Sequence, residues 1–130
     1  MSITVSWLHD RQTCILMTYS RQWTWQDFQA AYKQVDDHFV SVPHRVDLII
    51  DIHQAALPPP NGLSYFRQVS ESQHPNLGRI IVIGAPIFIR GIVNILMTLY
   101  RGRYLPPDFT FVPTLEDAKK LLVVAQSSSD

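Results

Sequence analysis

The residues of this chain that could do chemistry gather in one short stretch, from Val46 to His53, and in the loop that follows it. Asp51 and His53 stand two positions apart, a spacing that brings two side chains to the same face of a strand. A carboxylate beside an imidazole suits general acid–base catalysis. Because no nucleophile or second acid accompanies the pair, we predict no catalytic residue. We expect Asp51 to accept hydrogen bonds from the backbone of the next turn.

Metal and phosphate chemistry are less well supported by the sequence. The five histidines are scattered, and no two have the close helical spacing of a zinc protease: they are His9, His38, His44, His53 and His74. The pair Asn61-Gly62 opens a predicted helix whose backbone N–H groups would suit an anion, but no glycine-rich phosphate loop accompanies it. We therefore predict no metal site and no cofactor.

Composition favours a single globular domain over residues 1–130. With 46% hydrophobic and 17% charged residues, the chain can bury a core and is not disordered. The 11 acidic and 11 basic residues balance, which argues against nucleic acid or an anionic membrane as partner. The lone Cys14 excludes an internal disulfide, and we interpret it as a buried residue. No signal peptide and no transmembrane segment is predicted, so we expect a cytoplasmic protein.

The order of elements places Asp51 at the end of a central strand. Strands are predicted over residues 3–8, 14–19, 46–53, 79–84 and 109–112, with helices beginning near residues 25, 63, 87 and 115. The resulting order, β-β-α-β-α-β-α-β-α, predicts an α/β fold with a mostly parallel five-stranded sheet and an antiparallel N-terminal strand. Open sheets of this class bind ligands at the carboxyl ends of their strands, where Asp51 falls.

Two helices carry further signals. Thr24 and Asp27 have the spacing of a capping box, and we interpret the flanking Trp23 and Trp25 as a hydrophobic staple and core anchor, not as stacking platforms for a base or sugar.

The predicted helix from Ile87 to Tyr100 is more apolar than a helix that only covers a sheet needs to be. Deep burial, a surface for self-association or a partner, and the wall of an apolar ligand pocket all remain open. In a pocket, Arg90 or Arg101 could bind a carboxylate or phosphate head group.

Taken in order, these stretches resemble the STAS/SpoIIAA-like family over essentially the whole chain. The features that carry the resemblance are Trp23-Thr24-Trp25 with Asp27-Phe28, the strand VDLIIDIH, the Pro-rich loop closing in Asn61-Gly62-Leu63, the strand RIIVIG, and the ending FVPTLEDA. The better-known members are bacterial anti-sigma-factor antagonists. The chain also looks like bacterial SpoIIAA-like proteins of uncharacterised function, which are related in shape to CRAL-TRIO lipid carriers.

One departure from the family pattern concerns regulation. The antagonists carry a phosphorylatable serine just before a Gly-Leu pair that opens a helix. Here Pro60 and Asn61 precede Gly62-Leu63, and Ser64 lies on the other side of the glycine. The resemblance therefore implies the fold without the phosphorylation switch.

These observations predict a non-enzymatic STAS-like regulatory or protein-interaction module that is homodimeric. The alternative is a small carrier or sensor for an apolar or amphipathic ligand such as a lipid. The expected partner is a second copy or a regulatory protein. The candidate ligand or partner surface comprises Asp51, His53, Pro60, Asn61, Gly62, Ser64, Arg90, Ile92, Leu96 and Arg101.

Overall fold

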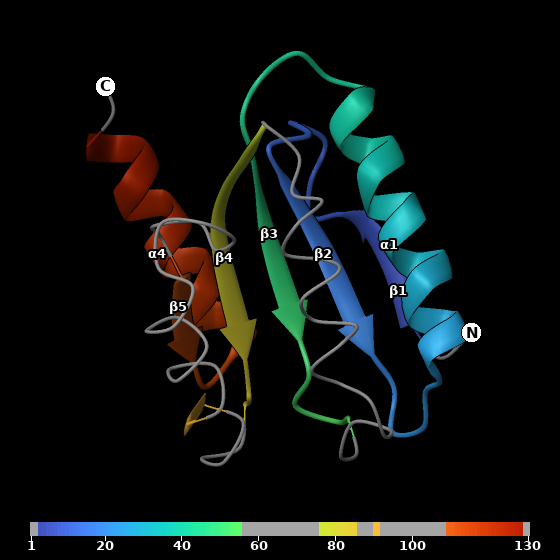
Figure 1. Ribbon diagram of the computed structural model, residues 1–130. Coiled ribbons are helices and arrows are strands. Elements are labelled where there is room, and N and C mark those ends of the chain that lie inside the picture. Colours follow the sequence, from blue (N-terminus) through green and yellow to red (C-terminus); the bar gives the residue numbers. More distant parts are fainter. Residues whose placement is uncertain (1–2, 56–75, 86–89, 92–108, 129–130) are drawn as a thin grey trace.

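A five-stranded mixed sheet forms the centre of the computed structural model, which describes residues 3–55, 76–85, 90–91 and 109–128 (Figure 1). The strands lie side by side in sequence order: β1 (Ile3–Trp7), β2 (Cys14–Tyr19), β3 (Val46–Asp51), β4 (Leu77–Ile83) and β5 (Phe109–Val112). β1 pairs antiparallel with β2, and every later neighbouring pair is parallel. The predicted α/β class, the five strands and the antiparallel N-terminal strand are confirmed.

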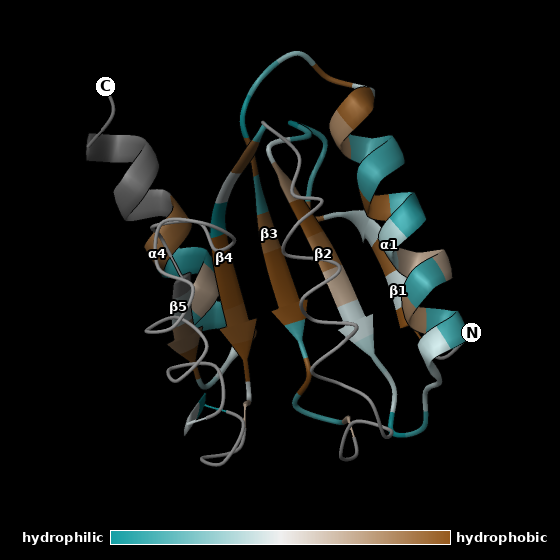
Figure 2. Ribbon diagram, viewed as in Figure 1, coloured by the Kyte–Doolittle hydropathy of each residue, from teal (hydrophilic) through white to brown (hydrophobic). Residues whose placement is uncertain are grey.

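Two helices in the described part of the chain cover opposite faces of this sheet. α1 (Trp25–Val40) buries Ala31, Val35 and Phe39 against one face, and α4 (Leu115–Ser128) buries Ala118 and Leu122 against the other. In Figure 2, β3 and β4 are brown along much of their length, as strands that are buried on both faces must be. None of the helices in these segments is long and apolar enough to cross a membrane.

Both helices begin with the side-chain contacts that their sequences indicate. At α1, the Thr24 hydroxyl accepts the Asp27 backbone N–H at 3.1 Å, and the Asp27 carboxylate accepts the Thr24 N–H at 3.0 Å. At α4, the Thr114 hydroxyl accepts the Asp117 N–H at 3.2 Å. These contacts satisfy backbone donors that a helix start otherwise leaves without partners. The predicted capping box at α1 is confirmed.

Element boundaries differ from the expectation by one or two residues. The first strand ends at Trp7 instead of Leu8, and β3 ends at Asp51, so that His53 lies in the turn beyond it. β4 begins at Leu77, two residues earlier than predicted. The helix predicted near residues 63–72 lies outside the described residues. Of the one predicted over residues 87–100, only residues 90–91 are described, and they are helical.

Candidate functional site

The carboxyl edge of the sheet brings together the ends of three parallel strands. Thr18 on β2 is in register with Asp51 on β3, which is in register with Ile83 on β4. Because parallel strands all run the same way, the loops that follow them leave from this one edge. The Pro-rich loop that the sequence predicts after β3 begins here.

Asp51 is the buried polar residue of this edge, with a side chain that is 11% exposed. Its Oδ1 accepts the His53 backbone N–H at 3.1 Å and also contacts His53 Nδ1. The Ala55 N–H donates to the Ile52 carbonyl at 3.0 Å and closes the same turn. The predicted role of Asp51, as acceptor for the backbone of the next turn, is confirmed.

His53 is oriented by these contacts but remains half exposed, with 49% of its side chain accessible. Its Nδ1 faces the carboxylate, and no hydrogen bond of Nε2 occurs among the described residues. On the neighbouring strand end, Gly84 has a φ of +72°, and a Cβ there would lie 2.7 Å from the His53 Cα. The chain after β3 is therefore held between a buried carboxylate and a position that only glycine fits without strain.

This arrangement can orient an imidazole, which is half of what acid–base catalysis needs. In the described part of the chain, no hydroxyl, thiol or second carboxylate is hydrogen-bonded to the His53 ring. The contacts that the pair makes among these residues lie within its own turn.

Arg90 is also anchored at the carboxyl edge. Its Nε donates to the Ala85 carbonyl at 3.1 Å, and its guanidinium carbon lies 5.8 Å from the centre of the Phe111 ring. The two contacts tie the arginine to the ends of β4 and β5. The other predicted site residues lie outside the described residues: Pro60, Asn61, Gly62, Ser64, Ile92, Leu96 and Arg101.

Of the other described histidines, His38 and His44 make structural contacts, whereas the His9 Nδ1 is buried without a hydrogen-bond partner among the described residues. His38 Nδ1 lies 2.6 Å from the Gln34 carbonyl, and His44 Nε2 lies 2.8 Å from the Gln12 carbonyl. Among residues 3–55, 76–85, 90–91 and 109–128, no group of three or more His, Cys, Asp or Glu side chains could hold a metal ion.

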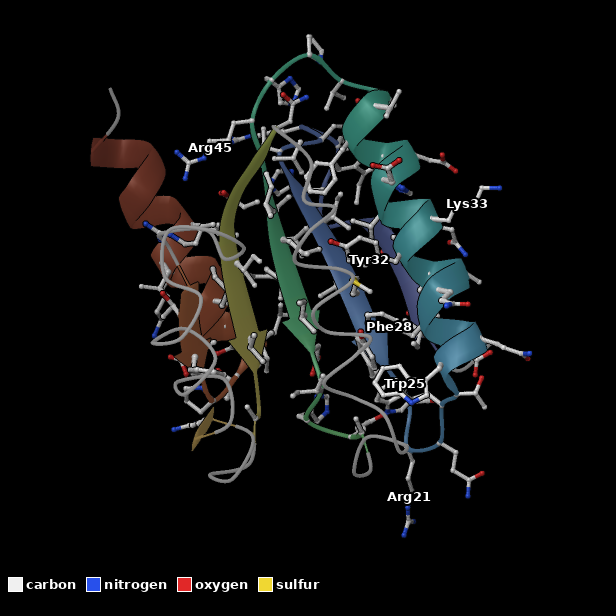
Figure 3. The ribbon with its side chains drawn as sticks, viewed as in Figure 1. Arg21, Trp25, Phe28, Tyr32, Lys33 and Arg45 are labelled. Carbon is white, nitrogen blue, oxygen red and sulfur yellow. The ribbon has the colours of Figure 1, made fainter. Side chains whose placement is uncertain are left out.

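An aromatic cluster at the start of α1 is larger than the sequence indicated. The Trp23 ring packs edge-to-face on the Trp25 ring, and its centre lies 6.3 Å from the centre of the Phe28 ring. The contact between Trp23 and Phe28 joins the positions of a hydrophobic staple. Tyr19 at the end of β2 and Tyr32 on α1 extend the cluster at both ends. Figure 3 shows Trp25, Phe28 and Tyr32 on the side of α1 that faces the sheet, whereas Lys33 points away from it.

Burial affects the pKa of one side chain of this cluster, and a second side chain has a buried polar atom. Burial, with a smaller contribution from the charge of Asp36, raises the pKa of Tyr32 to about 12. The Trp23 Nε1 is buried without a hydrogen-bond partner among the described residues.

The spacing of Trp23 and Phe28 along the chain is that of a hydrophobic staple. The contact of Tyr19 with Trp23 could not be predicted in this way, because it depends on where β2 ends in space.

The fold and the edge define an α/β protein with a mixed five-stranded sheet and a carboxylate–imidazole pair at the end of its central parallel strand. A scan against protein-family models finds no match to the chain. A search of curated protein sequences likewise finds no match.

Proposed function

We propose that this chain is a non-enzymatic, STAS-like module of the cytoplasm that regulates a protein partner by contact and works as a homodimer. Its working surfaces are the loop from Ala55 to Ser64 and the apolar helix that starts at Pro86. The observation that carries this proposal is the way in which Asp51 holds the start of that loop.

The Asp51 carboxylate engages both the backbone and the ring of His53, and the turn closes with the Ala55 hydrogen bond. Gly84 lies against the other side of His53. The first residues of the loop, as far as Ala55, therefore leave the sheet in one defined direction. Residues that are held in place before contact lose less conformational entropy on binding, which favours recognition of a partner.

A second candidate function, a carrier for an amphipathic ligand, is favoured by Arg90. The Arg90 Nε donates to the Ala85 carbonyl, and the face of the guanidinium group lies over the Phe111 ring. Its terminal nitrogens make no hydrogen bond among the described residues. Such a fork binds carboxylates and phosphates well, and an apolar helix beside it would suit the tail of a lipid.

The test is native mass spectrometry of the chain purified gently from its own host, together with Ile92→Asp and Leu96→Asp. Val40→Asp is the matched control, because Val40 is 68% exposed on α1, away from the proposed surfaces. We expect a protein partner at fixed stoichiometry with the wild type and the control. Both helix variants should lose that partner while keeping the wild-type circular dichroism spectrum.

The alternatives give different results. A bound mass of a few hundred daltons in place of a protein would favour the carrier. Helix variants that unfold would place residues 92 and 96 in the core and remove the helix from the working surface. Helix variants that retain the partner would also contradict the proposed surface.

A further inference from the structure

In the described part of the chain, no strand pairs with the outer side of β1. β1 pairs with β2 on one side and is the last strand of the sheet order on the other (Figure 1). An edge strand presents a row of backbone N–H and C=O groups that another strand can pair with.

The register of the β1–β2 hairpin determines which backbone groups of β1 point away from β2. Leu8 stands opposite Cys14 in this register, and the Leu8 N–H donates to the Cys14 carbonyl at 2.8 Å. In an antiparallel pair, hydrogen-bonded and non-hydrogen-bonded positions alternate. Thr4 and Ser6 are therefore bonded to β2, whereas the backbone groups of Ile3, Val5 and Trp7 point away from it.

α1 covers one face of β1, but the strand itself lacks the charges and prolines that protect many edge strands. Its sequence ITVSW contains no charged residue and no proline, and its pairing with β2 is regular over all 5 residues. The opposite edge differs. β5 has only 4 residues, Pro113 follows it directly, and Pro106, Pro107 and Asp108 precede it in the sequence. Prolines and charges at an edge oppose strand addition, so the sequence around β5 protects that edge and the sequence of β1 does not.

The side chains of β1 suit the same contact. Thr4 and Ser6 are small, exposed and on the face opposite α1. Ile3 is buried on the α1 face, and the half-buried Val5 and Trp7 extend the hydrophobic core outward to the edge. A strand added here would cover more of these two apolar side chains.

We propose that β1 pairs antiparallel with β1 of a second copy of this chain, about a twofold axis at Val5. This inference rests on the homodimer of the proposed function and assigns its interface. In this register Val5 faces Val5 of the partner subunit, and Thr4 faces Ser6 of the partner subunit. Every outward N–H of the strand Ile3–Trp7 then meets an outward carbonyl, because an isologous contact matches a surface with itself. The two sheets join into one, and the carboxyl edge of each copy stays open to the regulated partner.

Two charge variants test the register. Thr4→Lys with Ser6→Lys puts like charges opposite each other across the axis, whereas Thr4→Lys with Ser6→Glu pairs opposite charges there. Both positions are exposed, so both variants should fold. Sedimentation equilibrium should give a dimer for the wild type and for the lysine–glutamate variant. The dissociation constant of the double-lysine variant should rise about tenfold or more. A monomeric wild type, or equal dimerisation of both variants, would overturn the proposal.

A disulfide test checks the axis independently. Val5→Cys should form a disulfide-linked dimer under mild oxidation, because the two copies of residue 5 face each other. Ser6→Cys is the control, since its copies are offset diagonally, by about 8 Å from strand spacing and rise, beyond disulfide reach. The native Cys14 is 1% exposed and should not interfere. Equal crosslinking of both variants, or crosslinking of residue 6 alone, would contradict the assigned axis.

These tests separate the interface from the proposed function. A double-lysine variant that is monomeric but still binds the host partner would support the β1 interface and leave partner regulation intact. A dimer that follows the charge pattern but binds no partner would support the interface alone.

Discussion

β3 carries an aspartate at each end on the same face of the sheet, and the two are used differently. At the amino end, Asp47 accepts the Arg79 backbone N–H of the neighbouring strand at 2.7 Å and lies 3.8 Å from the Arg45 guanidinium. At the carboxyl end, Asp51 bonds to the turn that continues its own strand. The Asp47 carboxylate links two neighbouring strands, whereas the Asp51 carboxylate binds the turn that follows its own strand.

At each end of β3, the chain also lies close to a glycine that belongs to β4 or directly follows it. Gly78 leaves room for the Asp47 and Arg45 side chains, and Gly84 leaves room for the backbone of His53. At the amino end the crowded atoms belong to side chains, of which Arg45 is 64% exposed and can move. At the carboxyl end they include main-chain atoms, which cannot move without shifting the turn. The backbone is therefore more closely packed at the carboxyl end of β3 than at its amino end.

The largest expected effect is that of Gly84→Ala. The residue has a φ of +72°, and its new Cβ would lie 2.7 Å from the His53 Cα, so strain and a backbone shift should cost about 2–4 kcal/mol of unfolding free energy. Urea denaturation measures this loss. Gly78→Ala should cost less, because Gly78 has no positive φ and its Cβ would meet only side-chain atoms, those of Arg45 and the Asp47 carboxylate.

Gly91→Ala is the matched control, since Gly91 is helical and a Cβ there would meet nothing within 4 Å. It should leave stability unchanged or raise it by up to about 1 kcal/mol. If Gly84→Ala were as stable as this control, the difference between the two ends of β3 would not hold.

The next effect in size separates the two aspartates by stability. Asp47→Ala leaves the Arg79 N–H without its acceptor between two strands, which should cost about 1–3 kcal/mol. Asp51→Ala should cost about 1 kcal/mol, because water can reach the exposed turn at His53. The same denaturation experiment measures both, with the exposed Asp10→Ala as control, expected within about 0.5 kcal/mol of the wild type. A larger loss at Asp51 than at Asp47 would reverse the assignment.

Hydrogen exchange should show which backbone each carboxylate holds. In Asp51→Ala, the His53 amide should exchange about tenfold faster, while the Arg79 amide changes little. Asp47→Ala should produce the opposite pattern. Exchange measured by nuclear magnetic resonance resolves both amides in one sample, and a common change at both sites would argue against independent roles.

The smallest effect concerns Cys14, which faces Asp47 in the sheet register. Burial first, and then the charge of Asp47, raise the pKa of the Cys14 thiol from 9.0 to about 12. The unfolded thiol therefore ionises first, and its contribution to stability, complete below pH 9.0, is lost as the pH rises towards 12. Asp47→Asn should reduce this loss slightly and Asp51→Asn should not, as measured by urea midpoints across that range. Equal effects of the two variants would show that Asp47 is not a cause of the shift.

The sequence predicted well those features that depend on local pattern. The continuous apolar runs around Ile49 and Ile81 identify strands covered on both faces, and both residues are fully buried. Thr24 and Asp27 identify the start of α1, because a cap is made within one helical turn. The hydrogen bond of Asp51 was predictable for the same reason, since the donor, the His53 N–H, lies only two residues further along the chain.

The contacts between distant segments could not be predicted from the sequence. Nothing in the residues around Gly84 indicates that His53 packs against it, and nothing around Asp47 indicates that it accepts the Arg79 N–H. The inclusion of Tyr19 in the aromatic cluster, and the outward direction of the Val5 backbone, likewise depend on strand pairing.

By itself, the sequence determined the class of fold, the order of its strands along the chain, the caps and the position of Asp51. These follow from hydrophobic periodicity and from hydrogen bonds that span a few residues. Only the tertiary structure decided which aspartate serves a neighbouring strand and which serves a loop, and which sheet edge stays open. The register between strands sets both, because it alone determines which backbone groups of distant segments meet.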